Sequence, residues 1–171
     1  MYDGLAEAIV TNAIVMSDNN IGSDKTFPPY FYTDTAAWDT GAQFTVISQR
    51  VVDWLHLIPY QDAGIMGIGG LQIVKSYKVT IGLPNGKLVH DVEVYCGDLE
   101  DYDILIGMDI ITLTDFCITN KDSRTRFFFR TPSEGNIEFL AHLTLRDVEG
   151  IQPDTSDIVA QAHNTLAGGS Q

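Results

Sequence analysis

Short apolar stretches separated by turn-forming residues run through most of this 171-residue chain. Residues 8–16 form an apolar, β-branched run that ends at the turn residues 18–20. In residues 87–96, apolar and polar side chains alternate with a period of two, which is typical of a strand with one buried face. The pattern predicts an all-β protein.

Further strand-like segments share this character. We expect strands at 30–38, 44–47, 71–81, 116–118 and 127–129. The third of these is expected to pair with residues 87–96 as a hairpin around the turn at 84–86. Ser48 can cap a short helix that reaches His56, and Asp109 can cap a second helix of one or two turns. The expected fold class is therefore all-β with one or two short helices.

The strand pattern weakens beyond about residue 130. Residues 137–145 are expected to form one more strand, and the small and polar residues from Asp147 onward are typical of a flexible tail. We therefore expect a folded domain over residues 1–130, followed by a C-terminal extension over residues 131–171.

Composition and charge narrow the class of protein. A hydrophobic share of 44% and an aromatic share of 10% are typical of a globular chain. A formal charge of −13 argues against nucleic-acid binding, because that affinity comes mainly from Lys and Arg. No basic-then-apolar leader opens the chain and no apolar run approaches the roughly 18 residues of a membrane span, so we expect a cytoplasmic protein without a membrane partner. Cys96 and Cys117 are expected to be buried free thiols, since two cysteines make no disulfide framework.

The segment Asp39-Thr40-Gly41-Ala42 is the main candidate for chemistry. It places a carboxylate at the end of an apolar strand, on a tight glycine turn, and the strand-like residues 44–48 follow it. Asp-Thr-Gly alone is a weak signal, because an ordinary β-turn after a strand has the same composition. The upstream segment Asp34-Thr35-Ala36-Ala37 repeats its first two residues but has alanine in place of glycine, so Asp39 is preferred to Asp34.

Two later segments give the motif its context. One is the glycine-rich run Gly64-Ile65-Met66-Gly67-Ile68-Gly69-Gly70, and the other is Ile104-Leu105-Ile106-Gly107. Together with Asp39-Thr40-Gly41-Ala42 and the residues through Gln49, they resemble the retropepsin-like aspartic proteases over roughly residues 8–130. The active-site stretch is especially similar to the cellular, DNA-damage-inducible kind and to the bacterial retropepsin-like proteins.

This resemblance implies a closed β-barrel that acts as an obligate homodimer, with the active site at the dimer interface and one Asp39 from each subunit. Thr40, Gly41 and Ala42 would complete the active-site loop, and Ile104, Leu105, Ile106 and Gly107 would brace it. A flap built from Met66, Gly67, Ile68, Gly69 and Gly70 would cover a polypeptide substrate. No metal and no cofactor is required, because two neighbouring carboxylates that share one proton can activate water. Activity is then expected at acidic to mildly acidic pH.

Three features depart from the family pattern. Trp38 is bulkier than the small aliphatic residue usual before the aspartate, and residues 17–29 make a longer connection than compact retroviral enzymes have. The extension after about residue 130 has no counterpart, which leaves open a different dimer interface. None of these features removes a catalytic group.

Other sites have weaker support. The histidines lack zinc-ligand spacing: His56, His90, His142 and His163. The acidic residues Asp98, Glu100, Asp101 and Asp103 lack a calcium-loop pattern and are expected to form an exposed turn. Ser48 and Ser76 have no evident histidine partner, and the cysteines have no electropositive setting. The only basic island, Arg124, Arg126 and Arg130, is expected to be a solvated strand edge, with docking of acidic segments as the other interpretation.

The sequence thus predicts a homodimeric aspartic endopeptidase with Asp39 as its catalytic residue. Two alternatives stay open: a catalytically silent module of the same fold that serves binding or dimerisation, and a protease limited to processing its own precursor. Retention of Asp39, Thr40 and Gly41 beside a glycine-rich flap favours an active enzyme.

Overall fold

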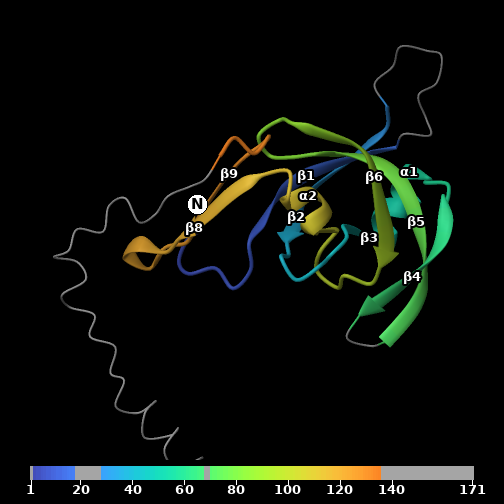
Figure 1. Cartoon of the computed structure of the whole chain (residues 1–171), viewed down its shortest axis with the longest axis horizontal. Coiled ribbons are helices and arrows are strands. Elements are labelled where there is room, and N and C mark those ends of the chain that lie inside the picture. Colours follow the sequence, from blue (N-terminus) through green and yellow to red (C-terminus); the bar gives the residue numbers. More distant parts are fainter. Residues whose placement is uncertain (1, 18–27, 68–69, 136–171) are drawn as a thin grey trace, which may run out of the picture. The chain divides into compact units, whose positions relative to one another are not determined.

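The computed structural model describes residues 2–17, 28–67 and 70–135, which form nine strands and two α-helices (Figure 1). The strands are β1 Val10–Ser17, β2 Tyr30–Trp38, β3 Val46–Ser48, β4 Gln61–Gly67, β5 Gly70–Gly82, β6 Leu88–Gly97, β7 Ile104–Ile106, β8 Asp115–Thr119 and β9 Arg126–Arg130. The helices are α1 Gln49–Leu55 and α2 Met108–Ile111, and a 3₁₀ turn covers Lys121–Ser123. The expected all-β class with one or two short helices is confirmed. The predicted strand at 137–145 lies outside the described residues.

Six of the strands close into a barrel. They pair in the order β1-β2-β7-β3-β6-β5, and β5 pairs back onto β1. The β2–β7 and β3–β6 pairs are parallel, and the other pairs are antiparallel. β5 is long enough to pair with β4 over residues 70–76 and with β1 over residues 79–82. β4 is therefore an edge strand that extends the barrel as one arm of a hairpin.

The core consists of the inward-facing side chains of the barrel strands together with one face of α1. On β1, Ala13 and Val15 alternate with more exposed neighbours, as the period of a half-buried strand requires. Val51, Val52 and Leu55 are the buried residues of α1, and their spacing places them on one face of this helix. None of the helices within the described residues is long and apolar enough to cross a membrane.

Both helices begin differently from what their sequences suggest. Ser48 stands at the first cap position of α1, but its hydroxyl makes no bond to the helix and donates to Asp103 instead, at 3.4 Å. Gly107, and not Asp109, occupies the cap position of α2. The prediction of Asp109 as the cap was wrong, because its carboxylate is used to hold another part of the chain.

β8 and β9 form a separate two-stranded sheet after the barrel. Their register pairs Phe116 with Phe129 and Ile118 with Phe127, so these four side chains share one face. Phe116 and Phe129 pack against the barrel core, while Phe128 on the other face is exposed. An apolar face thus attaches the hairpin to the barrel.

The carboxylate of Asp115 ties the start of β8 to the chain that follows β9. It accepts hydrogen bonds from the Ser133 hydroxyl at 2.6 Å, the backbone N–H of Glu134 at 2.9 Å and Nε of Arg130 at 2.7 Å. These bonds lower the pKa of Asp115 from 3.8 to about 2. The bond from Ser133 has the largest effect, followed by those from Glu134 and Arg130. Arg130 is therefore engaged in an ion pair, whereas the sequence suggested a solvated basic edge.

We expect the link between the start of β8 and the chain that follows β9 to weaken as the pH falls from about 4 to about 2. The pKa of Asp115 is lower in the folded chain than in the unfolded one, so its contribution is complete above 3.8 and is lost as the pH falls through about 2. Carbonyl-carbon NMR would follow Asp115 directly, with the backbone signals of Ser133 and Glu134 changing at the same midpoint. In Asp115→Asn those signals should no longer titrate together in this range. Unchanged titration in the variant would contradict the assignment.

Candidate active site

Asp39 follows the last residue of β2, where a parallel neighbour ends at the same level. β2 pairs with β7 so that Trp38 lies opposite Ile106, and the backbone N–H of Asp39 donates to the carbonyl of Ile106 at 2.9 Å. Ile104 and Ile106 are fully buried, whereas the Asp39 side chain is half-buried and Thr40 is exposed. The strand that ends at Ile106 therefore supports the loop from behind, while the loop itself faces outward.

The turn after Asp39 fixes the position of its carboxylate. The backbone N–H of Gly41 donates to Asp39 Oδ1 at 2.8 Å, and the N–H of Ala42 donates to the Asp39 carbonyl at 3.3 Å. A Cβ atom on Gly41 would lie 3.1 Å from Oδ1. The close approach to Oδ1 favours glycine at this position. The φ angle does not, because it lies outside the left-handed region.

A second carboxylate, that of Asp109, clamps the far end of the loop. Asp109 Oδ2 accepts the backbone N–H of Thr45 at 2.9 Å, and Oδ1 accepts the Thr45 hydroxyl at 2.7 Å. The Thr45 hydroxyl oxygen in turn accepts the N–H of Gly107 at 3.1 Å. Two backbone bonds complete the contact, from Met108 N–H to the Ala42 carbonyl at 2.8 Å and from Asp109 N–H to the Gln43 carbonyl at 3.2 Å. The loop is thus bound along its length to the start of α2.

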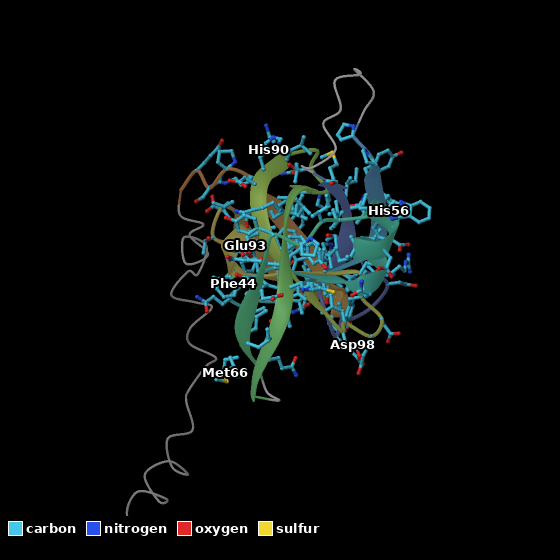
Figure 2. All side chains as sticks on the ribbon, turned by 90° about the vertical axis from the view of Figure 1, so that its right-hand side faces the viewer. Phe44, His56, Met66, His90, Glu93 and Asp98 are labelled. Atoms are coloured by element: carbon cyan, nitrogen blue, oxygen red, sulfur yellow. The ribbon has the colours of Figure 1, made fainter. Side chains whose placement is uncertain are left out.

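The glycine-rich segment forms the end of the β4–β5 hairpin. The two strands pair from Gln61 opposite Ser76 to Gly67 opposite Gly70, and Gly70 adopts a φ of +95° that favours glycine. Figure 2 shows Met66 toward the far end of this hairpin. Of the predicted flap residues, Ile68 and Gly69 lie outside the described part of the chain.

The two faces of this hairpin differ. Met66, Leu71 and Ile73 share one face with exposed fractions of 73%, 65% and 72%, whereas Ile65 on the opposite face is half-buried. Side chains alternate across a strand, so Ile65 and Met66 cannot both point toward the same bound segment. The predicted flap residue Met66 therefore lies on the exposed face of the hairpin.

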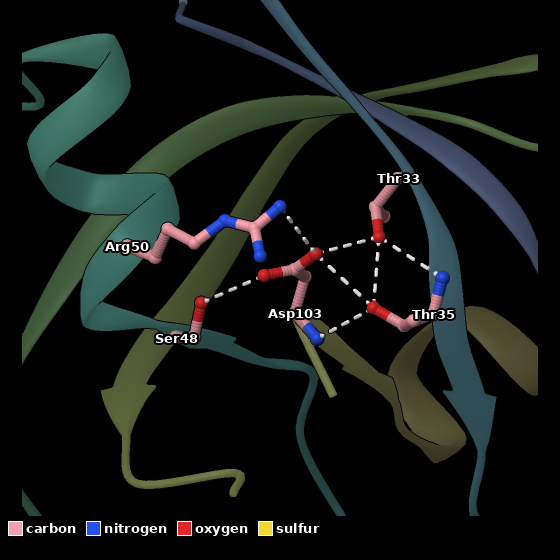
Figure 3. Close-up of polar contacts among 5 residues, drawn as sticks. All are labelled: Thr33, Thr35, Ser48, Arg50 and Asp103. Atoms are coloured by element: carbon pink, nitrogen blue, oxygen red, sulfur yellow. Dashed lines mark hydrogen bonds and ion pairs between the residues drawn. The ribbon is translucent and has the colours of Figure 1, made fainter. Parts of the chain in front are cut away.

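A buried carboxylate at the start of β7 was missed by the sequence interpretation. Asp103 was grouped with an exposed acidic turn, but its exposed fraction is only 5%. Its Oδ2 accepts the hydroxyls of Thr33 at 2.7 Å and Thr35 at 3.1 Å, and Arg50 lies 3.4 Å from the same oxygen (Figure 3). A buried polar group is tolerated when its bonding capacity is satisfied in this way. Asp103 thus joins β2 to α1 just before β7 begins.

Hollows on the surface lie around this network. A groove of about 510 Å³ runs between Gln72 and Val74 of the hairpin, the start of α1 and the β6–β7 connection at Gly97–Glu100. A larger hollow of about 760 Å³ lies on α1 and is lined by Gln49, Arg50, Asp53, Trp54 and His56. Neither of these two hollows is lined by Asp39, Thr40 or Gly41.

The remaining candidates gain no catalytic setting. No group of three or more potential metal ligands occurs among the residues that the structure describes. His56 ends α1 and is exposed, His90 bonds Thr80 at 3.1 Å, and His142 and His163 lie outside the described residues. Cys96 and Cys117 are free but half-buried. Burial, followed by the charge of Asp53, raises the pKa of the Cys96 thiol, which opposes a role as a thiolate nucleophile. Asp34 is exposed on β2.

Comparisons with known proteins find similarity among solved structures. The EIAV protease in complex with the inhibitor HBY-793 is 24% identical with a TM-score of 0.45, over 65% of this chain and 90% of the other. A retropepsin-like aspartic protease from Rickettsia conorii is 12% identical with a TM-score of 0.38, over 77% of this chain and all of the other. The foamy viral protease-reverse transcriptase in complex with an RNA/DNA hybrid is 18% identical with a TM-score of 0.37, over 91% of this chain and 17% of the other. No family model and no curated protein matches this chain.

Proposed function

We propose that this protein is an aspartic endopeptidase of retropepsin type, in which two copies of the chain each contribute one Asp39 to a shared site. The observation that carries the proposal is the way the loop is held. Asp39 Oδ1 accepts the Gly41 N–H, while the Asp109–Thr45 clamp and the Ile106 carbonyl fix the backbone on both sides of the motif. An ordinary turn needs no such set of bonds, whereas a catalytic carboxylate must be held rigidly.

The chemistry requires a second carboxylate next to the first. Two carboxylates in close contact cannot both ionise, so one stays protonated while the other accepts a proton from water. The water oxygen attacks the peptide carbonyl carbon, and the protonated carboxyl donates a proton to the carbonyl oxygen. Collapse of this tetrahedral intermediate breaks the C–N bond: the carboxyl that took the proton from water gives it to the departing amine nitrogen, and a hydroxyl of the intermediate returns a proton to the other carboxylate. The outward-facing Asp39 loop supports the proposal that the second carboxylate comes from a twin chain.

The substrate would be a polypeptide in extended form. β4 is an edge strand of the barrel sheet, and such an edge offers backbone groups to a peptide. In this proposal the β4–β5 hairpin acts as the flap, with the glycines at its end allowing it to hinge open for substrate. Thr40 would bond the equivalent loop of the twin chain, and Ile104, Leu105, Ile106 and Gly107 would brace the loop from within.

A cleavage profile tests the proposal. Wild-type protein is incubated with a diverse peptide pool from about pH 3.5 to about pH 7.5, and new termini are read by mass spectrometry. A statine-type transition-state mimic should suppress the cuts, with one molecule bound for every two chains. A dimeric protein that yields no cuts and binds no mimic would contradict the proposal and favour the binding module.

A further inference from the structure

Trp38 lies between the candidate catalytic residue and the β8–β9 hairpin. It is the last residue of β2 and directly precedes Asp39. Its ring centroid lies 5.0 Å from that of Phe127 and 5.1 Å from that of Phe129, both on β9. These are distances at which tilted aromatic rings attract one another beyond the effect of simple burial.

The orientation of the indole is also fixed by a hydrogen bond to β1. Nε1 of Trp38 donates to the Thr11 hydroxyl at 3.0 Å. The β1–β2 register shifts between Thr11 and Ala13, and irregularities of this kind redirect side chains near the point where they occur. The backbone N–H of Trp38 bonds the Ile9 carbonyl at 2.8 Å, so both main chain and side chain are held.

The β8–β9 hairpin that contacts Trp38 is also bonded to the N-terminal segment. Thr125, just before β9, donates its N–H to the Gly4 carbonyl at 2.8 Å, and its hydroxyl oxygen accepts the Ala6 N–H at 2.9 Å. The strands β8 and β9 pair with each other and with none of the barrel strands described. Trp38 therefore provides a direct mechanical link from this hairpin to the residue that precedes Asp39.

We propose that Trp38 is a positioning residue, through which the β8–β9 hairpin sets the orientation of the Asp39 carboxylate. This inference rests on the proposed function. Trp38 and Asp39 share a peptide bond, and the Asp39 N–H donates to the carbonyl of Ile106. A rotation of the indole therefore changes the backbone geometry of Asp39, which little slack in the chain can absorb. Catalytic groups must keep their productive geometry to within about 0.5 Å. A large rigid ring at this position therefore has a role that a small aliphatic residue could not fill.

The test compares two matched substitutions on the same strand. Phe129→Leu removes a ring that contacts Trp38, whereas Phe128→Leu alters a side chain that is 54% exposed on the other face of the hairpin. We expect Phe129→Leu to lower kcat by about tenfold while KM stays within about twofold. Phe128→Leu should leave both constants unchanged. At position 38 itself, Trp38→Phe should retain more activity than Trp38→Leu, because an aromatic ring is preserved.

A second measurement separates this inference from the proposed function. The NMR chemical shift of the Asp39 side-chain carboxyl carbon is compared between variants at one fixed pH, which needs no turnover. This chemical shift should differ from wild type in Phe129→Leu and not in Phe128→Leu, whether or not the wild type cleaves peptides. Thr11→Val, which keeps every aromatic ring, serves the same purpose if Phe129→Leu does not fold. Identical behaviour of Phe129→Leu and Phe128→Leu would overturn the positioning role, while absent cleavage by wild type would overturn the proposed function alone.

Discussion

Replacing Asp39 with asparagine is expected to abolish peptide cleavage and to leave the fold intact. In the wild type the Gly41 N–H donates to Asp39 Oδ1 at 2.8 Å. The side-chain oxygen of asparagine can accept the same bond, so the turn should be preserved. It cannot supply the proton exchange on which the attack of water depends. We expect kcat/KM to fall by at least about a thousandfold, measured with the peptides that the wild type cleaves best.

Asp34→Asn is the matched control for this substitution. Asp34 lies five positions upstream, also precedes a threonine, and is exposed on β2. Its replacement should leave kcat/KM within about twofold of wild type, because an isolated surface carboxylate contributes little. Circular dichroism and a cooperative thermal transition would establish that both variants are folded. Cleavage by a pure, folded Asp39→Asn protein would refute the assigned catalytic residue.

Replacing Gly107 with alanine is expected to have the largest effect on folding. A Cβ atom there would lie 2.5 Å from both the carbonyl carbon and the oxygen of Phe44, and 2.9 Å from the Thr45 nitrogen. These are backbone atoms of the loop that carries Asp39, so they cannot move aside without displacing the loop. We expect the free energy of unfolding to fall by about 3 kcal/mol or more, with loss of activity in whatever protein remains folded.

Gly64→Ala provides the comparison. A Cβ atom at this position meets only the flexible ends of Leu71 and Ile73, at 3.2 and 3.8 Å. Its effect on the free energy of unfolding should stay within about 1 kcal/mol, as measured by urea denaturation. Equal stability of the two variants would show that the close approach of Gly107 to the Phe44 backbone is not required.

Much of the barrel follows from local patterning. The apolar face of α1 identifies its buried positions directly, because a helix has a fixed period. In β6 the alternation marks Val92 and Val94 as buried, but Leu88 at the start of the strand is 49% exposed, since the register with β5 shifts between Val79 and Ile81. The hairpin of β4 and β5 was only partly anticipated. Its glycines resemble a loop in sequence, yet Gln61–Gly67 pairs with β5 along its whole length. Strand formation there depends on a long-range partner more than on residue preference.

The carboxylates illustrate what a local pattern cannot reveal. Asp103 follows three acidic residues that are exposed, and only the fold brings Thr33, Thr35 and Arg50 around it. Asp109 looked like a helix cap, because a short acidic side chain before an apolar run is typical of one. Its actual partner, Thr45, is 64 positions away. The sequence did contain one signal: Asp103 and Asp109 lie on either side of the apolar run that includes Ile104–Ile106. A carboxylate next to a buried segment must be either hydrogen-bonded or exposed.

Trp38 marks a further limit of the sequence. Its bulk was noted as a departure from the family pattern, but its partners Phe127 and Phe129 are about 90 positions downstream. The aromatic run in β9 predicted a strand without saying what it would cover. The fold supplies that information, since it places one face of the β8–β9 hairpin on the residue before Asp39.

The most direct test of the central claim is a subunit-mixing experiment. Wild type and Asp39→Asn are combined in denaturant in equal amounts, refolded together, and assayed for cleavage at a fixed total concentration. If each site needs an Asp39 from each of two chains, random pairing leaves only about a quarter of the sites intact. The activity should then be about a quarter of that of pure wild type at the same total protein concentration. Activity of about one half would mean that each chain acts alone, and would contradict the shared site.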